Sequence, residues 1–207
     1  MKITWLGHSC FSLEYDGYKI ITDPYEGVPG YPDLNLNANA VYCSHQHFDH
    51  SAVHRVTVSP AAKSPFTIRE IPAYHDDKQG KSRGENMIRV FTAGGVSVAH
   101  MGDLGHLLTP VQKSELGAPD VILMPIGGVY TLDARQAKKA CDEIGARCVI
   151  PMHYHHAPYG LSNLGGLDEF LALWNRNAVH MLPGPDWTVT HQLSGVIVPL
   201  FQPDKKS

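Results

Sequence analysis

A run of seven residues, 44–50, holds the densest group of metal-binding side-chain types in the sequence: Ser-His-Gln-His-Phe-Asp-His. His45 and His47 are two residues apart at the exit of an expected strand, and side chains two apart on a strand point to the same side. Asp49 and His50 follow directly. Three imidazoles and one carboxylate at this spacing can hold two cations about 3.5–4 Å apart, as dinuclear hydrolases do to activate one water molecule. A coincidental, solvated histidine-rich loop is the weaker alternative.

Short strands are expected on both sides of this run. Asp16-Gly17 and Gly94-Gly95 predict two hairpin turns, and the Pro-, Gly- and Asn-rich stretch 24–39 predicts a loop. Apolar or alternating segments predict strands over residues 2–6, 10–15, 18–22, 40–44, 67–73, 87–93, 96–100, 121–124, 148–152, 178–182 and 195–201.

Two segments have the apolar period of a helix. The first begins at Asp133 and Gln136, which form a capping box, and ends at Gly145. The second has its apolar residues at 167, 170, 171 and 174. Many strands with few helices predict an α/β fold of sheets packed on each other and covered by helices. Because no linker or repeat divides the chain, one domain is expected over residues 1–207.

Composition narrows the classes of protein. With 43% hydrophobic and 18% charged residues, the 207-residue chain is expected to fold. A net charge of -3 disfavours a nucleic-acid groove. The four cysteines form no CxxC pair, the start has no secretory pattern, and the apolar run 121–130 is too short to span a bilayer. We therefore expect a cytoplasmic protein that does not enter the membrane.

The pattern His-x-His-x-Asp-His over residues 45–50 matches the signature of the metallo-β-lactamase superfamily, and the chain resembles that superfamily over essentially its whole length. The segments 6–9, 124–128 and 150–154 resemble a branch of small bacterial metal-dependent hydrolases that includes L-ascorbate-6-phosphate lactonase and, more distantly, N-acyl-phosphatidylethanolamine phospholipase D. The resemblance implies a four-layer αβ/βα sandwich of two packed mixed sheets, with helices outside and the metals at one edge between the sheets.

The resemblance also implies a set of seven ligands: His45, His47, Asp49, His50, His75, Asp103 and His153. In the family pattern, one cation is bound by His45, His47 and His75. The other is bound by Asp49, His50 and His153, and Asp103 touches both. Asp49 is expected to accept a proton during the reaction. Two divalent cations are implied, with zinc expected first and manganese or iron as alternatives, because histidine and carboxylate ligands alone do not choose between them.

Several residues keep open alternatives. Asp23 either fixes a ligand imidazole or forms a plain turn before Pro24. His8 and His106 either face the substrate or contact the ligands, against the simpler reading of isolated structural histidines. For the last ligand position, His155 and His156 compete with His153.

Two departures from the family pattern affect the site. Ser44 stands where the family usually has threonine, and only 24 residues separate His50 from His75, so the usual helical excursion there is short or absent. On the other hand, His47 stands where di-iron, oxygen-reducing relatives have glutamate, which favours hydrolysis.

We therefore predict a dinuclear metal-dependent hydrolase in which a metal-bound hydroxide cleaves a small ester, lactone or phosphoester. The alternatives are a phosphodiesterase or nuclease of the same fold, and a non-catalytic, metal-stabilised binding protein. The expected partner is a small-molecule substrate and not a membrane or nucleic acid, and assembly into a homo-oligomer is left open.

Overall fold

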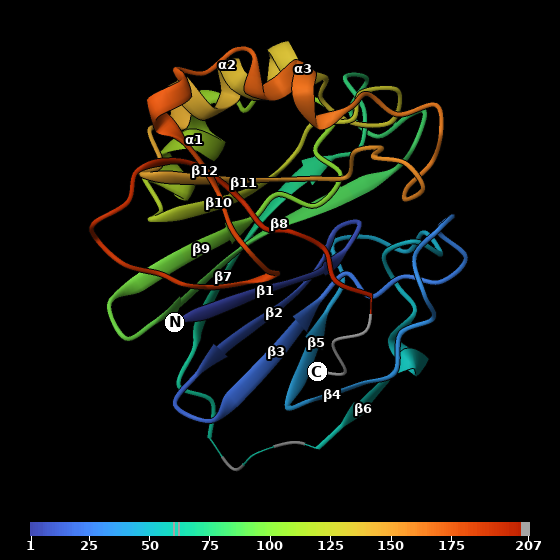
Figure 1. Cartoon of the computed structure of the whole chain (residues 1–207), viewed down its shortest axis with the longest axis vertical. Helices are drawn as coiled ribbons and strands as arrows, with labels where there is room; N and C mark the ends of the chain where they lie inside the picture. Colours follow the sequence, from blue (N-terminus) through green and yellow to red (C-terminus); the bar gives the residue numbers. More distant parts are fainter. Residues whose placement is uncertain (60, 62, 204–207) are drawn as a thin grey trace.

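The computed structural model describes residues 1–59, 61 and 63–203, and it builds two β-sheets that pack face to face (Figure 1). The first sheet has the strand order β13-β1-β2-β3-β5 and is mixed, because β3 and β5 are parallel while the other pairs are antiparallel. Its strands are β1 (Lys2–Gly7), β2 (Cys10–Tyr15), β3 (Tyr18–Thr22), β5 (Ala40–Tyr42) and β13 (Asp186–Thr188).

The second sheet has the order β12-β14-β11-β10-β9-β8-β7, and it is parallel from β12 to β9 and antiparallel from β9 to β7. Its strands are β7 (Thr67–Tyr74), β8 (Glu85–Ala93), β9 (Val96–His100), β10 (Val121–Pro125), β11 (Cys148–Met152), β12 (Val179–Met181) and β14 (Gly195–Val198). All five residues of β10 and of β11 are buried, as expected for parallel strands covered on both faces.

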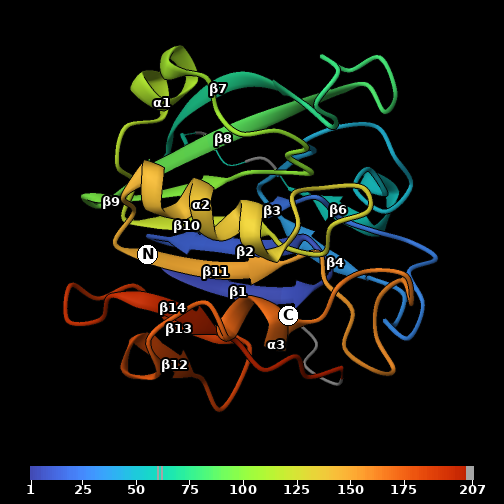
Figure 2. The same cartoon turned by 90° about the horizontal axis from the view of Figure 1, so that it is seen from above.

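Three α-helices cover the outer side of the second sheet: α1 (Pro110–Leu116), α2 (Ala134–Ile144) and α3 (Leu167–Leu171) (Figures 1 and 2). The predicted capping box starts α2, where Asp133 accepts from the backbone N–H of Gln136 and Gly145 ends the helix at a left-handed φ of 70°. The α2 face that contains Ala137, Ala140 and Cys141 is buried against the sheet.

The first sheet has no α-helix on its outer face in the described residues (Figure 1). In place of the helical layer that the resemblance implies, an irregular segment and a two-stranded ladder cover this face. Strand alternation places Ile20 in the main core and Ile21 in a second apolar cluster on the other face. That second cluster is closed by the segment predicted as loop, together with the short ladder of β4 (Leu36–Ala38) and β6 (Val56–Val58). The loop prediction over 24–39 was therefore wrong at 36–38: the alternation of Leu34, Leu36 and Ala38 with asparagines is visible in the sequence, but the Pro-, Gly- and Asn-rich composition was given more weight.

The predicted fold class, two packed mixed sheets with few helices, is confirmed. Two short 3-10 helices, η1 (Val53–Arg55) and η2 (Arg176–Ala178), complete the elements. The stretch between His50 and His75 contains no α-helix among its described residues, as its length suggested. None of the described helices is long and apolar enough to cross a bilayer.

Candidate metal centre

The predicted ligands follow strand ends that meet at one edge of the two sheets. His45 comes three residues after β5, His75 directly after β7, Asp103 three residues after β9 and His153 directly after β11. The carboxyl ends of neighbouring parallel strands are a common place for binding sites, since loops from several strands converge there. Segments more than 100 residues apart in the chain are thereby brought together, as the rings of His50 and His153 show with centroids 5.6 Å apart.

Asp103 lies at the centre of the group and is 2% exposed. Its Oδ2 is 3.1 Å from His75 Nε2, 3.2 Å from His153 Nε2 and 4.0 Å from His45 Nε2. Its Oδ1 is 3.2 Å from His50 Nε2. One carboxylate therefore faces four imidazoles that come from three different segments.

The ligand-type atoms form three groups, each with all its atoms within 4.8 Å of one another, and the third of them, Asp23, His45 and His50, shares one member with each of the other two. One group contains His45, His47 and His75, the three residues that the family pattern gives to the first cation. Another contains the predicted second set with one addition: His8, Asp49, His50 and His153. The split into two neighbouring groups is the geometry that two cations need.

The hydrogen-bonding state of the group indicates that cations fit it. His45 Nε2, His50 Nε2 and Asp103 Oδ1 are buried and make no hydrogen bond, although the last two lie only 3.2 Å apart. An unpaired buried polar atom costs about 1–3 kcal/mol, so several at one point need a reason. Imidazole nitrogens and carboxylate oxygens directed at a common centre are the ligands of zinc and similar cations, which would satisfy these atoms.

The outer nitrogens of three imidazoles have partners that fix the ring orientation. His50 Nδ1 is 2.7 Å from Asp23 Oδ2, His75 Nδ1 is 3.0 Å from the carbonyl of Tyr130, and His45 Nδ1 is 2.9 Å from Ser44 Oγ. With the proton on Nδ1, each ring presents the lone pair of Nε2 to the centre. Partners of this kind normally orient metal-binding histidines.

Asp23 has a larger role than a plain turn. It is 1% exposed, and it accepts hydrogen bonds from the backbone N–H and the hydroxyl of Ser44, each at 2.6 Å, in addition to its contact with His50. Burial opposes ionisation of Asp23, but His100, His50 and Ser44 outweigh it and lower its pKa to about 2. Ser44 therefore links Asp23 to His45.

The imidazoles do not share one protonation state. Burial, supported by His50, lowers the pKa of His45 to about 3, so this ring is neutral at pH 7. Burial also lowers the pKa of His50, but Asp103 and Asp23 outweigh it and raise the value well above the ordinary one. Because a histidine must be neutral to bind a cation, metal binding to this site should release a proton.

The remaining predicted residues lie at different distances from the centre. His8 is fully buried within the second group. His106 is half-buried; its Nε2 accepts from the backbone N–H of Tyr74, just before His75, and it is not in either group. His155 and His156 are half-buried and also outside the groups, so of the three rivals the structure brings only His153 to the centre.

Two residues that support Asp103 were missed by sequence reasoning. Asn86 accepts from the backbone N–H of Asp103 at 2.9 Å and donates to the carbonyl of Met101 at 2.9 Å. His100 is buried and bridges the carbonyl of Ser9 at 2.9 Å and the N–H of Gly102 at 3.1 Å. Neither residue lies in a motif, so the sequence carries no signal for these contacts.

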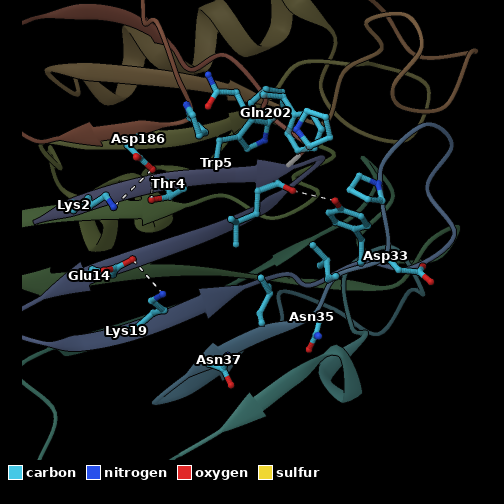
Figure 3. A pocket seen from close by; sticks show the side chains of 18 residues that line it. Lys2, Thr4, Trp5, Glu14, Lys19, Asp33, Asn35, Asn37, Asp186 and Gln202 are labelled. Carbon is cyan, nitrogen blue, oxygen red and sulfur yellow. Dashed lines mark hydrogen bonds and ion pairs between the residues drawn. The ribbon is translucent and has the colours of Figure 1, made fainter. Parts of the chain in front are cut away.

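The chain also has a cavity of about 670 Å³ on the outer side of the first sheet, and Figure 3 shows the side chains that line it. Four of its five charged groups pair with one another, Lys2 with Asp186 at 3.8 Å and Lys19 with Glu14 at 3.6 Å, and the fifth, Asp33, pairs with Arg55 at 3.4 Å. None of the histidines in the two groups lines this cavity. The histidine and aspartate centre is therefore the better candidate for chemistry.

Known proteins resemble the chain over most of its length. The family model for the beta-lactamase superfamily domain matches residues 2–153. A UPF0173 metal-dependent hydrolase from Methanoculleus marisnigri is 33% identical, with 79% of this chain and 85% of the relative covered. A UPF0173 metal-dependent hydrolase from Carboxydothermus hydrogenoformans is 28% identical, with 82% of this chain and 91% of the relative covered. The crystal structure of a Thermotoga maritima protein, named as a proposed Zn-dependent hydrolase of the metallo-β-lactamase superfamily, is 34% identical with a TM-score of 0.75, covering 97% of this chain and 99% of that one.

Proposed function

Because the chain belongs to the metallo-β-lactamase superfamily, within its UPF0173 family of metal-dependent hydrolases, we propose that it hydrolyses a small ester, lactone or phosphoester with two divalent cations. Hydrolysis as the class of reaction follows from family membership. The number of cations and the class of substrate are the proposal. The observation that carries it is that the six other predicted ligands fall into two groups of close ligand atoms, with the Asp103 carboxylate facing imidazoles of both.

In this proposal His45, His47 and His75 hold the first cation, and Asp49, His50 and His153 hold the second. Asp103 contributes to both, because its two oxygens face imidazoles of different groups. Zinc is the first choice, since nitrogen and carboxylate ligands suit it and the Thermotoga maritima relative is named as proposed to depend on it; manganese and iron are the alternatives.

Two such cations would lower the pKa of a shared water molecule and withdraw charge from the carbonyl or phosphoryl oxygen of the substrate. The protein supplies orientation and proton transfer. Asp23 and the carbonyl of Tyr130 keep His50 and His75 in the Nδ1–H tautomer. Although burial raises the pKa of Asp49, the contacts with His8 and His50 lower it below its ordinary value, so this carboxylate is ionised and can accept a proton from the attacking water.

The substrate would approach past the exposed side chains of His47 and Phe48, on the side where the first group meets solvent. Phe48 is 56% exposed and follows His47 in the chain, so it could offer an apolar contact to a substrate that arrives from this side. With a net charge of -3, the chain lacks the basic excess that a nucleic-acid substrate would favour.

The test is metal analysis with a matched pair of variants. Protein prepared without chelator should contain about two equivalents of metal, and it should hydrolyse members of a panel of p-nitrophenyl esters, lactones and bis(p-nitrophenyl) phosphate. Asp103→Ala should lose turnover and at least one equivalent, whereas the control Asp142→Ala, on the exposed face of α2, should keep both. Retained turnover in Asp103→Ala would reject the mechanism, and activity on the phosphodiester alone would identify a phosphodiesterase.

A further inference from the structure

His8 lies at the tip of the hairpin between β1 and β2 and is completely buried at the second group of ligand atoms. The strands close at the pair Gly7 and Cys10, so His8 is the first residue of a two-residue turn. Its ring centroid is 4.3 Å from that of His153 and 5.4 Å from that of His50. A hairpin tip, normally a surface feature, therefore places an imidazole beside the centre.

The backbone of His8 has a φ of 50°, the left-handed region that favours glycine. For a histidine this costs on the order of 1 kcal/mol, and such residues persist where the surroundings hold them. Here the indole N–H of Trp5 donates to the carbonyl of His8 at 3.0 Å, and Trp5 itself is 2% exposed in the core. The turn is thus fixed in a conformation that glycine or asparagine would adopt more easily.

The contact that gives His8 a role is with Asp49, whose Oδ2 lies 3.3 Å from His8 Nε2. Among the described residues, this is the one hydrogen bond that the Asp49 side chain makes. Its next neighbour, His50 Nε2, is 3.7 Å away. Without His8 the carboxylate would be free to rotate about its terminal torsion, and its oxygens would not be held toward the second group.

The other nitrogen of His8 decides its tautomer. Nδ1 is buried and has no partner. If Nδ1 carried the proton, a buried N–H would be unpaired and the lone pair of Nε2 would face the carboxylate of Asp49, which is repulsive. With the proton on Nε2, the ring donates to Asp49 and leaves only a lone pair unpartnered, which costs less.

A cation ligand would need the opposite tautomer, with the lone pair on Nε2. His45, His50 and His75 have that tautomer fixed by partners on Nδ1, as ligating histidines normally do. His153 also lacks a partner on Nδ1, but its Nε2 lies 3.2 Å from Asp103 at the centre. His8 has neither feature.

Resting on the function proposed above, we propose that His8 is a positioning residue: its Nε2–H holds the carboxylate of Asp49 in the orientation that the second cation requires. It acts through Asp49 and does not bind the cation itself. The role explains why the turn between β1 and β2 keeps a strained histidine where glycine would be easier.

Two substitutions of similar size separate this role from the alternatives. In His8→Gln, the amide nitrogen can replace Nε2 as a donor to Asp49, whereas His8→Met removes the donor and keeps the volume. Metal-free, full-length proteins are titrated with Zn²⁺ in a calorimeter, and their melting temperatures are compared. Should His8→Met not fold, His8→Asn takes its place, because its amide is too short to reach Asp49 and suits a positive φ.

We expect His8→Met to bind the weaker equivalent of zinc about 10–100-fold less tightly, with the stronger equivalent unchanged. His8→Gln should restore affinity close to that of the wild type. Unchanged affinity in His8→Met would overturn the proposal, and so would a His8→Gln as weak as His8→Met, which would indicate that the imidazole binds the cation directly. If the wild type itself takes up fewer than two equivalents, the proposed dinuclear function fails instead.

Discussion

Asp23→Asn should leave the metal-free protein folded and yet weaken metal binding at both groups. Asp23 Oδ1 accepts from the backbone N–H of Ser44, and Oδ2 accepts from the hydroxyl of Ser44 and from His50 Nδ1. In the variant, the amide oxygen must take the backbone N–H, since that donor has no other partner. The amide NH₂ then faces Ser44 Oγ and His50 Nδ1, and it donates to both.

The change of residue 23 from acceptor to donor alters the protonation of two imidazole rings, His50 and His45. His50 Nδ1 becomes an acceptor, so a neutral His50 must carry its proton on Nε2, which faces Asp103 Oδ1 at 3.2 Å. The hydroxyl of Ser44, now an acceptor from the amide, turns its proton toward His45 Nδ1 at 2.9 Å, and His45 changes tautomer in the same way. Both rings lose the lone pair that would bind a cation.

The magnitudes follow from the burial of Asp23, which is 1% exposed. Hydrogen bonds to a charged group contribute about 1.5–3 kcal/mol and neutral ones about 1 kcal/mol, so the metal-free variant should lose only about 1–2 kcal/mol of unfolding free energy. Asp23→Ala leaves the donors unpaired in a buried place and should lose about 3–5 kcal/mol. Zinc affinity in Asp23→Asn should fall about 10–100-fold for each equivalent, the usual effect of losing such a partner.

Urea denaturation of the chelator-treated proteins measures the losses in unfolding free energy. Calorimetric titration with Zn²⁺ measures the affinity for each equivalent of zinc. Long-range ¹H–¹⁵N NMR spectra of the imidazoles report the tautomer of His45 and His50 directly. Wild-type zinc affinity in Asp23→Asn, or rings that keep the proton on Nδ1, would refute this reasoning.

Three further outcomes are expected. Gly105→Ala places a Cβ 2.4 Å from the carbonyl carbon of His75, so it should weaken zinc binding and lower the melting temperature, while Gly166→Ala, whose Cβ comes no closer than 3.8 Å to a neighbour, should change neither. Leu13→Ala, fully buried between the sheets, should cost about 2–5 kcal/mol in urea denaturation and leave the metal content unchanged. Asp120→Asn should cost about 1–2 kcal/mol at pH 7, because burial raises the pKa of Asp120 less than the bonds from Ser97 and Arg147 lower it. A carboxylate with a lowered pKa stabilises the fold above its unfolded pKa of about 3.9 and loses that effect as the pH falls through its folded value. The difference in unfolding free energy between Asp120→Asn and wild type should therefore shrink below about pH 4. A constant difference down to pH 2 would contradict this assignment.

Much of the fold could be predicted because local patterns specify it. Helix α2 begins at Asp133 and ends at Gly145 as its capping signals indicated, and the hairpins at Asp16-Gly17 and Gly94-Gly95 form. Helix α1 was missed, although Thr109, Pro110 and Gln112 carry a capping box, because its seven residues are too few to show a helical period. The short strands β6 and β13 were missed because three residues are too few for a strand pattern, whereas β4 was missed although residues 34–40 alternate between apolar residues and asparagine.

The sequence by itself determined which chemistry is available. The pattern at residues 45–50 is local, since four ligand-type residues lie in one turn after a strand, and their spacing alone suggests two cations. The single histidines and aspartates further along the chain could be attached to it only through a family resemblance. Their roles as ligands remain a prediction that the metal titrations above can check.

Only the tertiary structure decided which isolated residues join the centre. No local pattern shows what His8, His100 and His106 contact, since each is a lone histidine near a strand end or turn. In the fold, His8 contacts Asp49, His100 connects the turn at Ser9 with Gly102, and His106 supports the end of β7. Strand pairing sets these distances between residues as many as 91 positions apart, and no local preference encodes which strands become neighbours.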